Sequence, residues 1–275
     1  MKIFIDSADI EEIKKAYSWG IIDGVTTNPS LIKLSLERRK AAGVQTELKD
    51  YITEILKIAK GTPVSLEVTE TTGEGMLTQG ILLYRLFNSV AKNVCIKIPI
   101  NPALTSDAVK QYEGIYAISE LAKRKIPVNC TLVFTPEQAL LAAKAGATYV
   151  SPFAGRVDDL LRTRSQTLFG QDEYYPSEGK EDKTKLIEDN GIVSGIDLVA
   201  QCVEIIKTYN LPTKVLAASL RNPRQVREAA LVGADVATIP FSVLNKLLIH
   251  PKTQEGMKKF VEDSVQEYKE LVNKK

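Results

Sequence analysis

The chain has 275 residues, 44% of them apolar and 25% charged, with a formal net charge of +2. These values are typical of a globular protein with one large core, and the balanced charge gives no indication of nucleic-acid or membrane-surface binding. The three cysteines form no CxxC pair and His250 is the one histidine, which argues against a disulfide framework, a thiolate zinc site and a Ser-His-Asp triad. The apolar start of the chain is too short for a signal peptide and no stretch is long enough to span a bilayer, so we expect a cytoplasmic protein.

Eight short apolar segments, most of them separated by amphipathic helical patterns, follow one another along the chain. They are residues 2–6, 24–28, 64–68, 94–100, 127–134, 148–153, 214–219 and 235–240. Near-continuous apolar strands that alternate with helices indicate a parallel sheet buried on both faces. Eight such units favour an α/β fold with a closed (β/α)₈ TIM barrel, which typically has about 250 residues. An open doubly wound sheet is the alternative, although no glycine-rich dinucleotide motif follows the first strand.

The helical segments carry start and stop signals. After the first strand, Ser7 is predicted to cap a helix that has Ile10 and Ile13 on its apolar face. Residues 135–147 (TPEQALLAAKAGA) and 222–234 (NPRQVREAALVGA) repeat one pattern, with a capping residue, a proline, a glutamine at the capping-box position and a late glycine. Because each of these two helices leads into a strand, the repeat supports the barrel.

Two insertions and the C-terminal segment depart from this rhythm. Residues 101–111 lengthen the connection after the fourth strand, and residues 160–192 are polar and weakly periodic, as expected of a long surface loop. Residues 253–273 predict an amphipathic helix. We therefore predict a single barrel domain over residues 1–275, with both insertions in strand-to-helix connections.

Polar side chains occur in or directly after most of the predicted strands, where the active site of an α/β barrel lies. They are Asp6, Asn28, Glu67, Lys97, Thr131, Ser151 and Ser219, with Arg156 and Arg221 following closely after two of the strands. Each of them, taken alone, has an ordinary structural explanation, such as a turn or a satisfied backbone group.

Lys97 differs from the others because it interrupts the apolar run VCIKIPI (94–100). Burial of a charged ammonium is costly, so this side chain is either ion-paired with Glu67 or Asp6, or a desolvated amine that attacks a carbonyl. In the second interpretation the lysine forms an imine, the carboxylates transfer protons and the arginines bind a phosphate.

Several stretches, in order along the chain, resemble the transaldolase family, in particular its short subfamily that also contains fructose-6-phosphate aldolases. The stretches are FIDSA (4–8), GVTTNPSLI (24–32), LEVT (66–69), IKIP (96–99), NCTLVF (129–134), GATYVSPFAGRVDD (146–159), AASLRNP (217–223) and GADVATIPF (233–241). The resemblance covers nearly the whole chain apart from the insertions. It implies a transferase of aldehyde or ketone residues with a class I Schiff-base mechanism, acting in carbohydrate metabolism and the pentose phosphate pathway. It also implies that no metal or organic cofactor is needed, because the imine serves as the electron sink.

The resemblance also implies roles for individual positions. Lys97 is similar to the Schiff-base lysine, and Asp6 to the acid/base that assists carbon–carbon cleavage and re-formation. Glu67, with Thr131, resembles the pair that positions the catalytic water. The other positions resemble substrate-binding residues, namely Asn28 and Ser151 for hydroxyl groups, Phe153 for the pocket wall, and Arg156, Ser219 and Arg221 for the phosphate.

Two positions favour a transaldolase over the related aldolase. The aldolases of this group carry glutamine where this chain has Glu67, and tend to have tyrosine where it has Phe153. The resemblance therefore implies transfer of a dihydroxyacetone unit from fructose 6-phosphate or sedoheptulose 7-phosphate to erythrose 4-phosphate or glyceraldehyde 3-phosphate. The alternatives are a fructose-6-phosphate aldolase, a different Schiff-base aldolase, and a barrel kept for binding or structure.

The insertions and the C-terminal helix lead to two further expectations. Residues 160–192 are hypothesised to narrow the barrel mouth or alter the acceptor aldose, with Arg162, Arg164, Tyr174 and Tyr175 as candidate contacts, unless they form a plain surface loop or an oligomer contact. Members of the subfamily form rings, often decamers, so the resemblance implies a homo-oligomer in which the C-terminal helix packs on a neighbour. The same helix could equally cover the barrel's own helices. Sugar phosphates are the expected partners, with no nucleic acid and no membrane.

Overall fold

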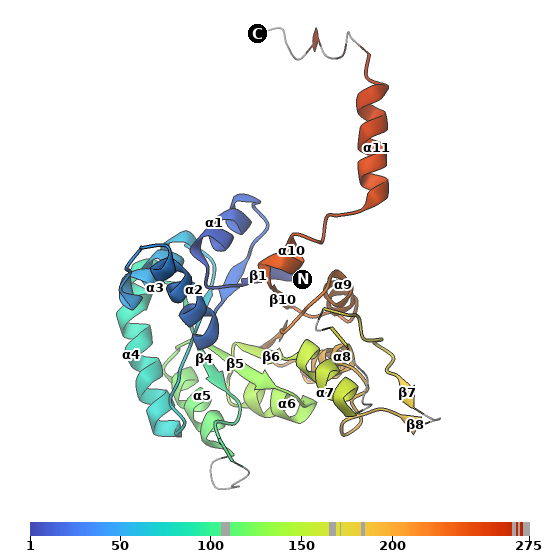
Figure 1. Ribbon diagram of the computed structural model, residues 1–275. Helices are drawn as coiled ribbons and strands as arrows, with labels where there is room; N and C mark the ends of the chain where they lie inside the picture. Colours follow the sequence, from blue (N-terminus) through green and yellow to red (C-terminus); the bar gives the residue numbers. More distant parts are fainter. Residues whose placement is uncertain are drawn as a thin grey trace.

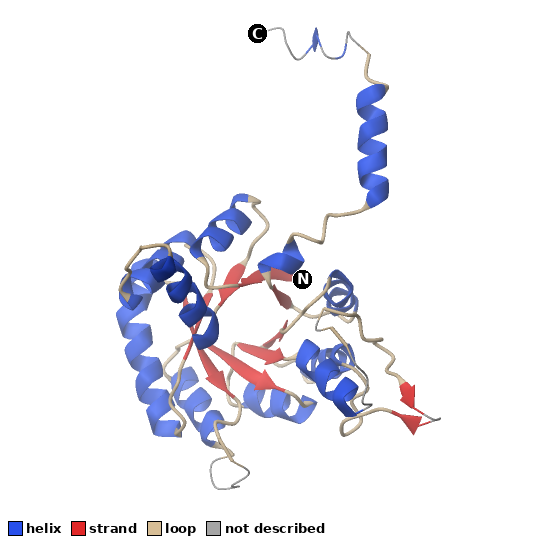
Figure 2. Cartoon of the chain, viewed as in Figure 1, coloured by secondary structure: helices blue, strands red, loops and turns tan. Residues whose placement is uncertain are grey.

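The computed structural model describes residues 1–105, 111–164, 169–170, 172–182, 185–265, 268 and 270–271. Eight of the described strands are parallel and close into a barrel in the order β1-β10-β9-β6-β5-β4-β3-β2 (Figures 1 and 2). They are β1 (Lys2–Asp6), β2 (Gly24–Thr26), β3 (Val64–Glu67), β4 (Val94–Pro99), β5 (Val128–Val133), β6 (Tyr149–Pro152), β9 (Lys214–Ala217) and β10 (Val236–Ile239). β1 pairs with both β2 and β10, which completes the ring. The predicted (β/α)₈ barrel is confirmed, and the open sheet is wrong.

Helices form an outer layer around these strands (Figure 2). They are α1 (Ile10–Ser18), α2 (Pro29–Ala41), α3 (Leu48–Ile58), α4 (Gly73–Ala91), α5 (Glu113–Lys123), α6 (Pro136–Lys144), α7 (Ala154–Arg164), α8 (Gly195–Thr208), α9 (Pro223–Leu231) and α10 (Phe241–Leu244). A further helix, α11 (Pro251–Glu262), lies apart from this layer. A short antiparallel hairpin, β7 (Glu181–Asp182) and β8 (Lys185–Leu186), lies between α7 and α8 in the chain. Among the helices of the described residues, none is long and apolar enough to cross a membrane.

Side chains alternate along the barrel strands between the barrel interior and the helix layer, as the two-residue period of a strand requires. Phe4 joins an interior cluster with Leu216 and Val236, whereas Ile5 belongs to the large core that includes the helices. Tyr149 packs edge-on against Phe4, with their ring centroids 5.9 Å apart. These apolar side chains fill the amino-terminal end of the barrel, so the inward positions two residues further along each strand lie above them.

Two glycines allow helices to begin directly against the ends of strands. A Cβ atom on Gly114 would lie 2.3 Å from the carbonyl oxygens of Pro99 and Ile100, at the end of β4. A Cβ atom on Gly155 would lie 2.2 Å from the carbonyl oxygen of Ser219. Because Cβ atoms do not approach oxygen atoms so closely, only glycine permits these contacts without a backbone shift. Both contacts lie at the carboxyl ends of the strands.

The caps, prolines and glycines of the repeated helix pattern are confirmed, whereas the glutamine completes a capping box in α6 only, since Gln225 of α9 accepts from the N–H of Arg221. Thr135 and Gln138 form a complete capping box at the start of α6. Asn222 caps α9 by accepting a hydrogen bond from the backbone N–H of Gln225 at 3.0 Å. The glycines that follow these helices have positive φ angles, 95° at Gly146 and 82° at Gly233, which L side chains rarely adopt.

The predicted cap of the first helix is wrong. Asp9 rather than Ser7 is the N-cap of α1, because its carboxylate accepts hydrogen bonds from the backbone N–H groups of Glu11 and Glu12. The hydroxyl of Ser7 instead accepts from the N–H of Asp9 and donates to Glu12 at 2.6 Å. Asp9 directly precedes the first helical residue, Ile10, so its carboxylate reaches the free N–H groups of the first turn.

The second insertion, predicted over residues 160–192, differs from a surface loop. Its first residues belong to α7, which continues to Arg164. Further along, Tyr175 and Ile192 are each only 1% exposed and join the main core. The prediction of a surface loop is therefore wrong for these residues, since they pack against the barrel. Parts of the two insertions, residues 106–110, 165–168, 171, 183 and 184, lie outside the described residues.

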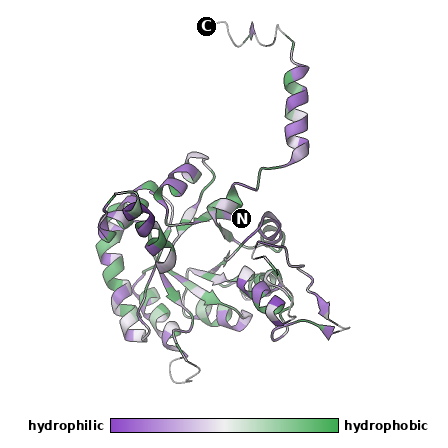
Figure 3. Cartoon of the chain, viewed as in Figure 1, coloured by the Kyte–Doolittle hydropathy of each residue, from purple (hydrophilic) through white to green (hydrophobic). Residues whose placement is uncertain are grey.

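Helix α11 projects away from the barrel (Figure 1). None of its residues is buried, and Figure 3 shows apolar and polar residues mixed along it. The helix ends at Glu262 instead of continuing from 253 to 273 as predicted. The Asp263-Ser264-Val265 sequence that follows has low helix propensity, which accounts for the end of the helix at this point. The alternative that this helix covers the barrel's own helices is wrong.

Candidate active site

A cavity of about 110 Å³ opens at the carboxyl ends of the barrel strands. Its lining residues are Asp6, Thr26, Asn28, Lys97, Asn129, Ser151, Phe153, Arg156, Leu216, Ala218, Ser219 and Thr238. Seven of them were predicted from the sequence, whereas Glu67, Thr131 and Arg221 are outside this set. A wider groove of about 390 Å³ at residues 36–47 is lined by no buried side chain, so the barrel mouth is the candidate site.

Lys97 projects from β4 into this cavity and is 5% exposed. Its Nζ lies 3.1 Å from Oε2 of Glu67 and donates a hydrogen bond to the carbonyl oxygen of Thr27, also at 3.1 Å. Glu67 and Lys97 occupy directly paired positions of β3 and β4, so the sheet register itself brings them together. The ion pair offsets the cost of burying the ammonium and gives its proton an acceptor within reach.

Asp6 enters the same cavity from β1. Thr26 donates a hydrogen bond to its carboxylate at 2.7 Å, and the hydroxyls of Thr26 and Thr238 lie 2.5 Å apart. Burial raises the pKa of Asp6 above its ordinary value, while the charge of Lys97 and the hydrogen bond from Thr26 oppose this rise. A carboxyl group with a raised pKa is suited to both accepting and returning a proton.

A row of buried hydrogen bonds crosses the cavity floor on β3, β5 and β6. Asn129 is paired with Lys97 in the sheet register; it donates to the hydroxyl of Ser65 at 3.1 Å and accepts from the hydroxyl of Ser151 at 2.7 Å. The hydroxyl of Thr131 is buried and has no hydrogen-bond partner among the described residues. The strand is irregular here, because its register with β6 shifts between Cys130 and Val133. A buried hydroxyl without a partner is a potential binding point for a water molecule.

Thr26, Asn129 and Thr238 are site residues that the sequence analysis missed. A positional signal was available for two of them. Asn129 stands two positions before Thr131 and so shares its face of the predicted strand. Thr26 stands two positions before Asn28 in the same way. For Thr238, the strand sequence DVATIP offered no distinction from an ordinary buried threonine.

The mouth of the cavity is formed by Asn28, Phe153, Arg156 and Ser219. Asn28 is also the N-cap of α2, with its Oδ1 accepting from the N–H of Leu31 at 2.9 Å. The exposed guanidinium of Arg156 lies over the ring of Phe153, 5.2 Å from its centroid. Ser219 has a φ of 61°, an unfavourable conformation for a non-glycine residue and one often found at functional sites.

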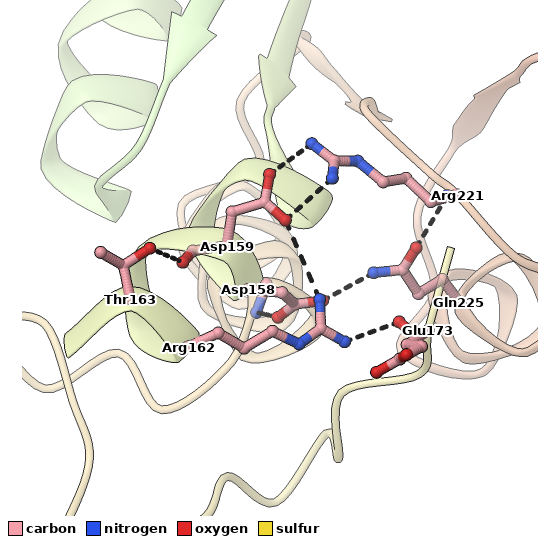
Figure 4. A network of polar contacts seen from close by, with 8 residues as sticks. Asp158, Asp159, Arg162, Thr163, Glu173, Arg221 and Gln225 are labelled. Atoms are coloured by element: carbon pink, nitrogen blue, oxygen red, sulfur yellow. Dashed lines mark hydrogen bonds and ion pairs between the residues drawn. The ribbon is translucent and has the colours of Figure 1, made fainter. Parts of the chain in front are cut away.

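Arg221 follows β9 and is fixed beside the mouth (Figure 4). Its two terminal nitrogens donate to the carboxylate of Asp159 at 2.8 and 2.5 Å. Its Nε would be 2.9 Å from a Cβ atom on Gly155, so the side chain passes over the residue that precedes Arg156. The predicted phosphate set is thus partly assembled, with Arg156 and Ser219 in the cavity wall and Arg221 next to them.

The four candidate contacts of the second insertion are engaged elsewhere. The guanidinium of Arg162 is buried, Tyr175 is buried, and Arg164 forms an ion pair with Asp189 at 2.7 Å. Tyr174 donates to Glu228 of α9 at 2.8 Å. None of the four is among the described residues that line the cavity. The hypothesis of direct substrate contact by these side chains has no support in their positions.

The site therefore combines a buried amine, a carboxylate in contact with it, a second carboxyl group with a raised pKa, several hydroxyl and amide groups, and arginines at the mouth. Such a set can form an imine with a carbonyl compound, move protons at neighbouring carbons and hold an anion at the entrance.

Known proteins of one family resemble this chain over nearly its whole length. The model of the family described as Transaldolase/Fructose-6-phosphate aldolase matches residues 3–274. A protein named "Probable transaldolase" from Thermoplasma volcanium is 43% identical over 263 residues, covering 96% of this chain and 95% of its own. Proteins of the same name from Chlorobium phaeobacteroides (strain BS1) and Aquifex aeolicus are 42% and 39% identical, each over 96% of this chain and over 97% and 96% of their own.

Proposed function

This chain belongs to the transaldolase/fructose-6-phosphate aldolase family, and from that premise we propose that it is a transaldolase. The proposed reaction transfers a dihydroxyacetone unit from fructose 6-phosphate or sedoheptulose 7-phosphate to erythrose 4-phosphate or glyceraldehyde 3-phosphate. The observation that carries the proposal is the amine of Lys97, buried in the cavity and 3.1 Å from the carboxylate of Glu67.

Lys97 is proposed to form the Schiff base. Its amine, having passed a proton to Glu67, attacks the C2 carbonyl of the ketose and forms a carbinolamine. Loss of water from the carbinolamine then gives the imine, for which Glu67 and the unpartnered hydroxyl of Thr131 hold the departing or returning water.

Asp6 is proposed to act on the C4 hydroxyl. When its carboxylate takes that proton, the C3–C4 bond breaks, the bonding electrons move into the imine, and glyceraldehyde 3-phosphate leaves from fructose 6-phosphate. The enamine on Lys97 then attacks the aldehyde carbon of the acceptor, and Asp6 returns the proton to the new hydroxyl group. Hydrolysis of the imine releases the product ketose.

The remaining residues are proposed to bind substrate. Asn28 and Ser151 hold hydroxyl groups of the dihydroxyacetone unit, and Phe153 forms the wall. Arg156, Ser219 and Arg221 bind the phosphate at the mouth, where an exposed arginine stacked on an aromatic ring is already positioned.

The test measures glyceraldehyde 3-phosphate release from fructose 6-phosphate, with and without erythrose 4-phosphate, together with borohydride trapping and peptide mass mapping. Many turnovers only with the acceptor, and an adduct on Lys97, are expected. Many turnovers without acceptor, with free dihydroxyacetone, would identify a fructose-6-phosphate aldolase, which uses the same imine. Absence of both release and adduct would reject the proposed chemistry.

We further propose that the protein is a cytoplasmic homo-oligomer, a ring such as a decamer, that acts in the pentose phosphate pathway. The exposed apolar residues of α11 support a contact with a second copy, since Met257, Phe260 and Val261 are 59%, 72% and 56% exposed. The cysteines Cys95, Cys130 and Cys202 are all buried free thiols, which fits a reducing compartment.

A further inference from the structure

One carboxylate, that of Asp159, lies between two guanidinium groups beside the barrel mouth (Figure 4). Arg221 pairs with it through both terminal nitrogens, at 2.8 and 2.5 Å. Arg162, one turn further along α7, approaches it with Nη1 at 3.8 Å from Oδ1. Arg162 thus adds a second positive charge beside the carboxylate of Asp159, in a cluster that also contains the carboxylate of Asp158.

Arg221 is fixed at its main chain as well as at its guanidinium. Its backbone N–H donates to Oε1 of Gln225 at 2.8 Å, and the amide nitrogen of Gln225 donates to Asp158 at 2.6 Å. Asp158 also accepts from the N–H of Gly195 at the start of α8, at 2.7 Å. These bonds hold the residue in place from three helices, α7, α8 and α9, so little freedom of position remains to the arginine.

Arg162 is held by the second insertion. It is 3% exposed, and its Nη2 donates to the carbonyl oxygen of Glu173 at 2.6 Å. Its guanidinium lies over the rings of Phe169 and Tyr175, at 4.8 and 5.4 Å from their centroids. The aromatic and carbonyl groups that surround this cation therefore come from a segment that does not line the cavity.

The charges of this cluster indicate what Arg162 does beside Asp159. A carboxylate that pairs with a phosphate-binding arginine orients it but also cancels much of its attraction for an anion. The buried cation of Arg162, on the other side of the carboxylate of Asp159, offsets part of that cancellation, and the neighbouring carboxylate of Asp158 limits the offset. Burial matters here, because a partly buried charge is less screened by salt than an exposed one.

We propose that Arg162 is a positioning and charge-balancing residue for phosphate binding, held in place by Phe169, Glu173 and Tyr175 and acting through Asp159 on Arg221. The second insertion thereby affects the affinity for the phosphate group of the substrate without touching the substrate. The proposal rests on the proposed function in one respect, the assignment of Arg221 to the phosphate.

The experiment compares Arg162→Gln with Arg162→Lys. Glutamine keeps a donor for the carbonyl of Glu173 but removes the charge, and lysine keeps the charge. Inorganic phosphate is the probe, with its dissociation constant measured by calorimetry at constant ionic strength. We expect Arg162→Gln to weaken phosphate binding about five- to tenfold and to raise the KM for fructose 6-phosphate by a similar factor, with kcat nearly unchanged. Arg162→Lys is expected to stay within about twofold of the wild type.

Two further measurements separate a charge effect from a packing effect. The kcat/KM for unphosphorylated fructose is expected to be the same in all three proteins, because that substrate carries no phosphate. Lys246→Met is the matched control, since Lys246 is a cation paired with the same insertion at Asp172, 3.9 Å away, and does not contact Asp159. It is expected to leave phosphate binding unchanged.

The proposal is overturned if Arg162→Gln binds phosphate like the wild type, or if Arg162→Lys is as weak as Arg162→Gln. Equal losses with fructose and fructose 6-phosphate, or an equal loss in Lys246→Met, would also overturn it. If Arg162→Gln does not fold, Phe169→Leu replaces it, because the smaller side chain weakens the contact with the guanidinium of Arg162. An unchanged phosphate affinity in Phe169→Leu would then overturn the proposal. If the wild type and the variants bind phosphate as expected but the wild type releases no aldose, the proposed function is rejected and the role of Arg162 in phosphate binding is not.

Discussion

The proposed role of Lys97 requires an amine that is buried and still reactive. Its ammonium lies at the one position of β4 where the neighbouring strand supplies a carboxylate in register, and this pairing makes burial tolerable. In the proposed mechanism, the same carboxylate accepts the proton that the amine has to lose before it can attack a carbonyl. The ion-paired lysine and the reactive lysine, which stood as alternatives in the sequence, are therefore compatible in one geometry.

Replacement of Lys97 tests whether charge or nucleophilicity matters. Lys97→Arg keeps a cation beside Glu67, whereas Lys97→Met removes it, and neither side chain forms an imine. Both variants are expected to lose at least about a thousandfold in turnover and to give no borohydride-trapped adduct. A variant that is still trapped at another lysine would show that the Schiff base forms elsewhere.

The raised pKa of Asp6 gives a pH dependence with a definite sign. Protonation removes the base needed for C3–C4 cleavage, so activity is expected to fall on acidification with a midpoint above the ordinary value of 3.8. Stability moves in the opposite direction. The folded state binds this proton more tightly than the unfolded state, so the stabilising effect is complete below 3.8 and is lost as the pH rises through the folded pKa.

The measurement is the pH profile of single-turnover cleavage for the wild type and for Asp6→Asn. The asparagine variant is expected to retain a small residual rate that does not fall on acidification, so its pH profile has no acidic limb. If the same acidic limb persists in Asp6→Asn, another group titrates and the role assigned to Asp6 is wrong.

Individual site residues were predictable where a polar side chain interrupts an apolar strand. Lys97 and Asp6 satisfied that condition, and both line the cavity. Thr26 and Asn129 did not stand out, because threonine and asparagine also occur in strands and turns for local reasons. The left-handed backbone of Ser219 and the contact of Arg221 with Asp159 depend on residues distant in sequence and had no local signal.

At the scale of the elements, the close contact of α7 with the loop after β9 depends on Gly155. Gly155→Ala places a methyl group 2.2 Å from the carbonyl oxygen of Ser219 and 2.9 Å from Nε of Arg221. The backbone would have to shift, so we expect a loss of about 1–3 kcal/mol in the free energy of unfolding, measured in urea, and weaker phosphate binding.

The control for this substitution is Gly256→Ala, inside α11, where an added Cβ atom meets nothing within 4 Å. Replacement of a glycine inside a helix by alanine is expected to raise helix stability by up to about 1 kcal/mol and to leave phosphate binding unchanged. Equal effects of the two substitutions would mean that the contact at Gly155 is not tight in solution.

The barrel strands were predictable because buried parallel strands have a simple apolar pattern, and all eight predicted segments contain the observed strands. The second insertion was not. Tyr175 and Ile192 stand among charged and polar residues, and their burial comes from contacts with the barrel rather than from periodicity. The residue at which α7 ends was not predictable either, because its last turn contains three polar residues, Arg162, Thr163 and Arg164.

At the scale of the whole molecule, α11 carries three exposed apolar side chains, Met257, Phe260 and Val261, that no element of the described part of the chain covers. Phe260→Asp is expected to lower the sedimentation mass of the protein at micromolar concentration, because a charge there opposes burial against a second copy. Lys259→Asp, on the opposite side of the helix, is expected to leave the mass unchanged. A protein that sediments as a single chain before any substitution would contradict the proposed homo-oligomer.

The apolar amino-terminal end of the barrel has a consequence for the order in which substrates bind and products leave in the proposed reaction. Phe4, Leu216 and Val236 are each at most 1% exposed, so in the described part of the chain the barrel interior is closed at its amino-terminal end. In the proposed reaction, the aldose that is released and the aldose that accepts the dihydroxyacetone unit would therefore use the same opening, past Arg156, and could not occupy it together. Initial-rate plots at several acceptor concentrations should therefore give parallel lines, and excess acceptor should compete with the donor for the empty opening.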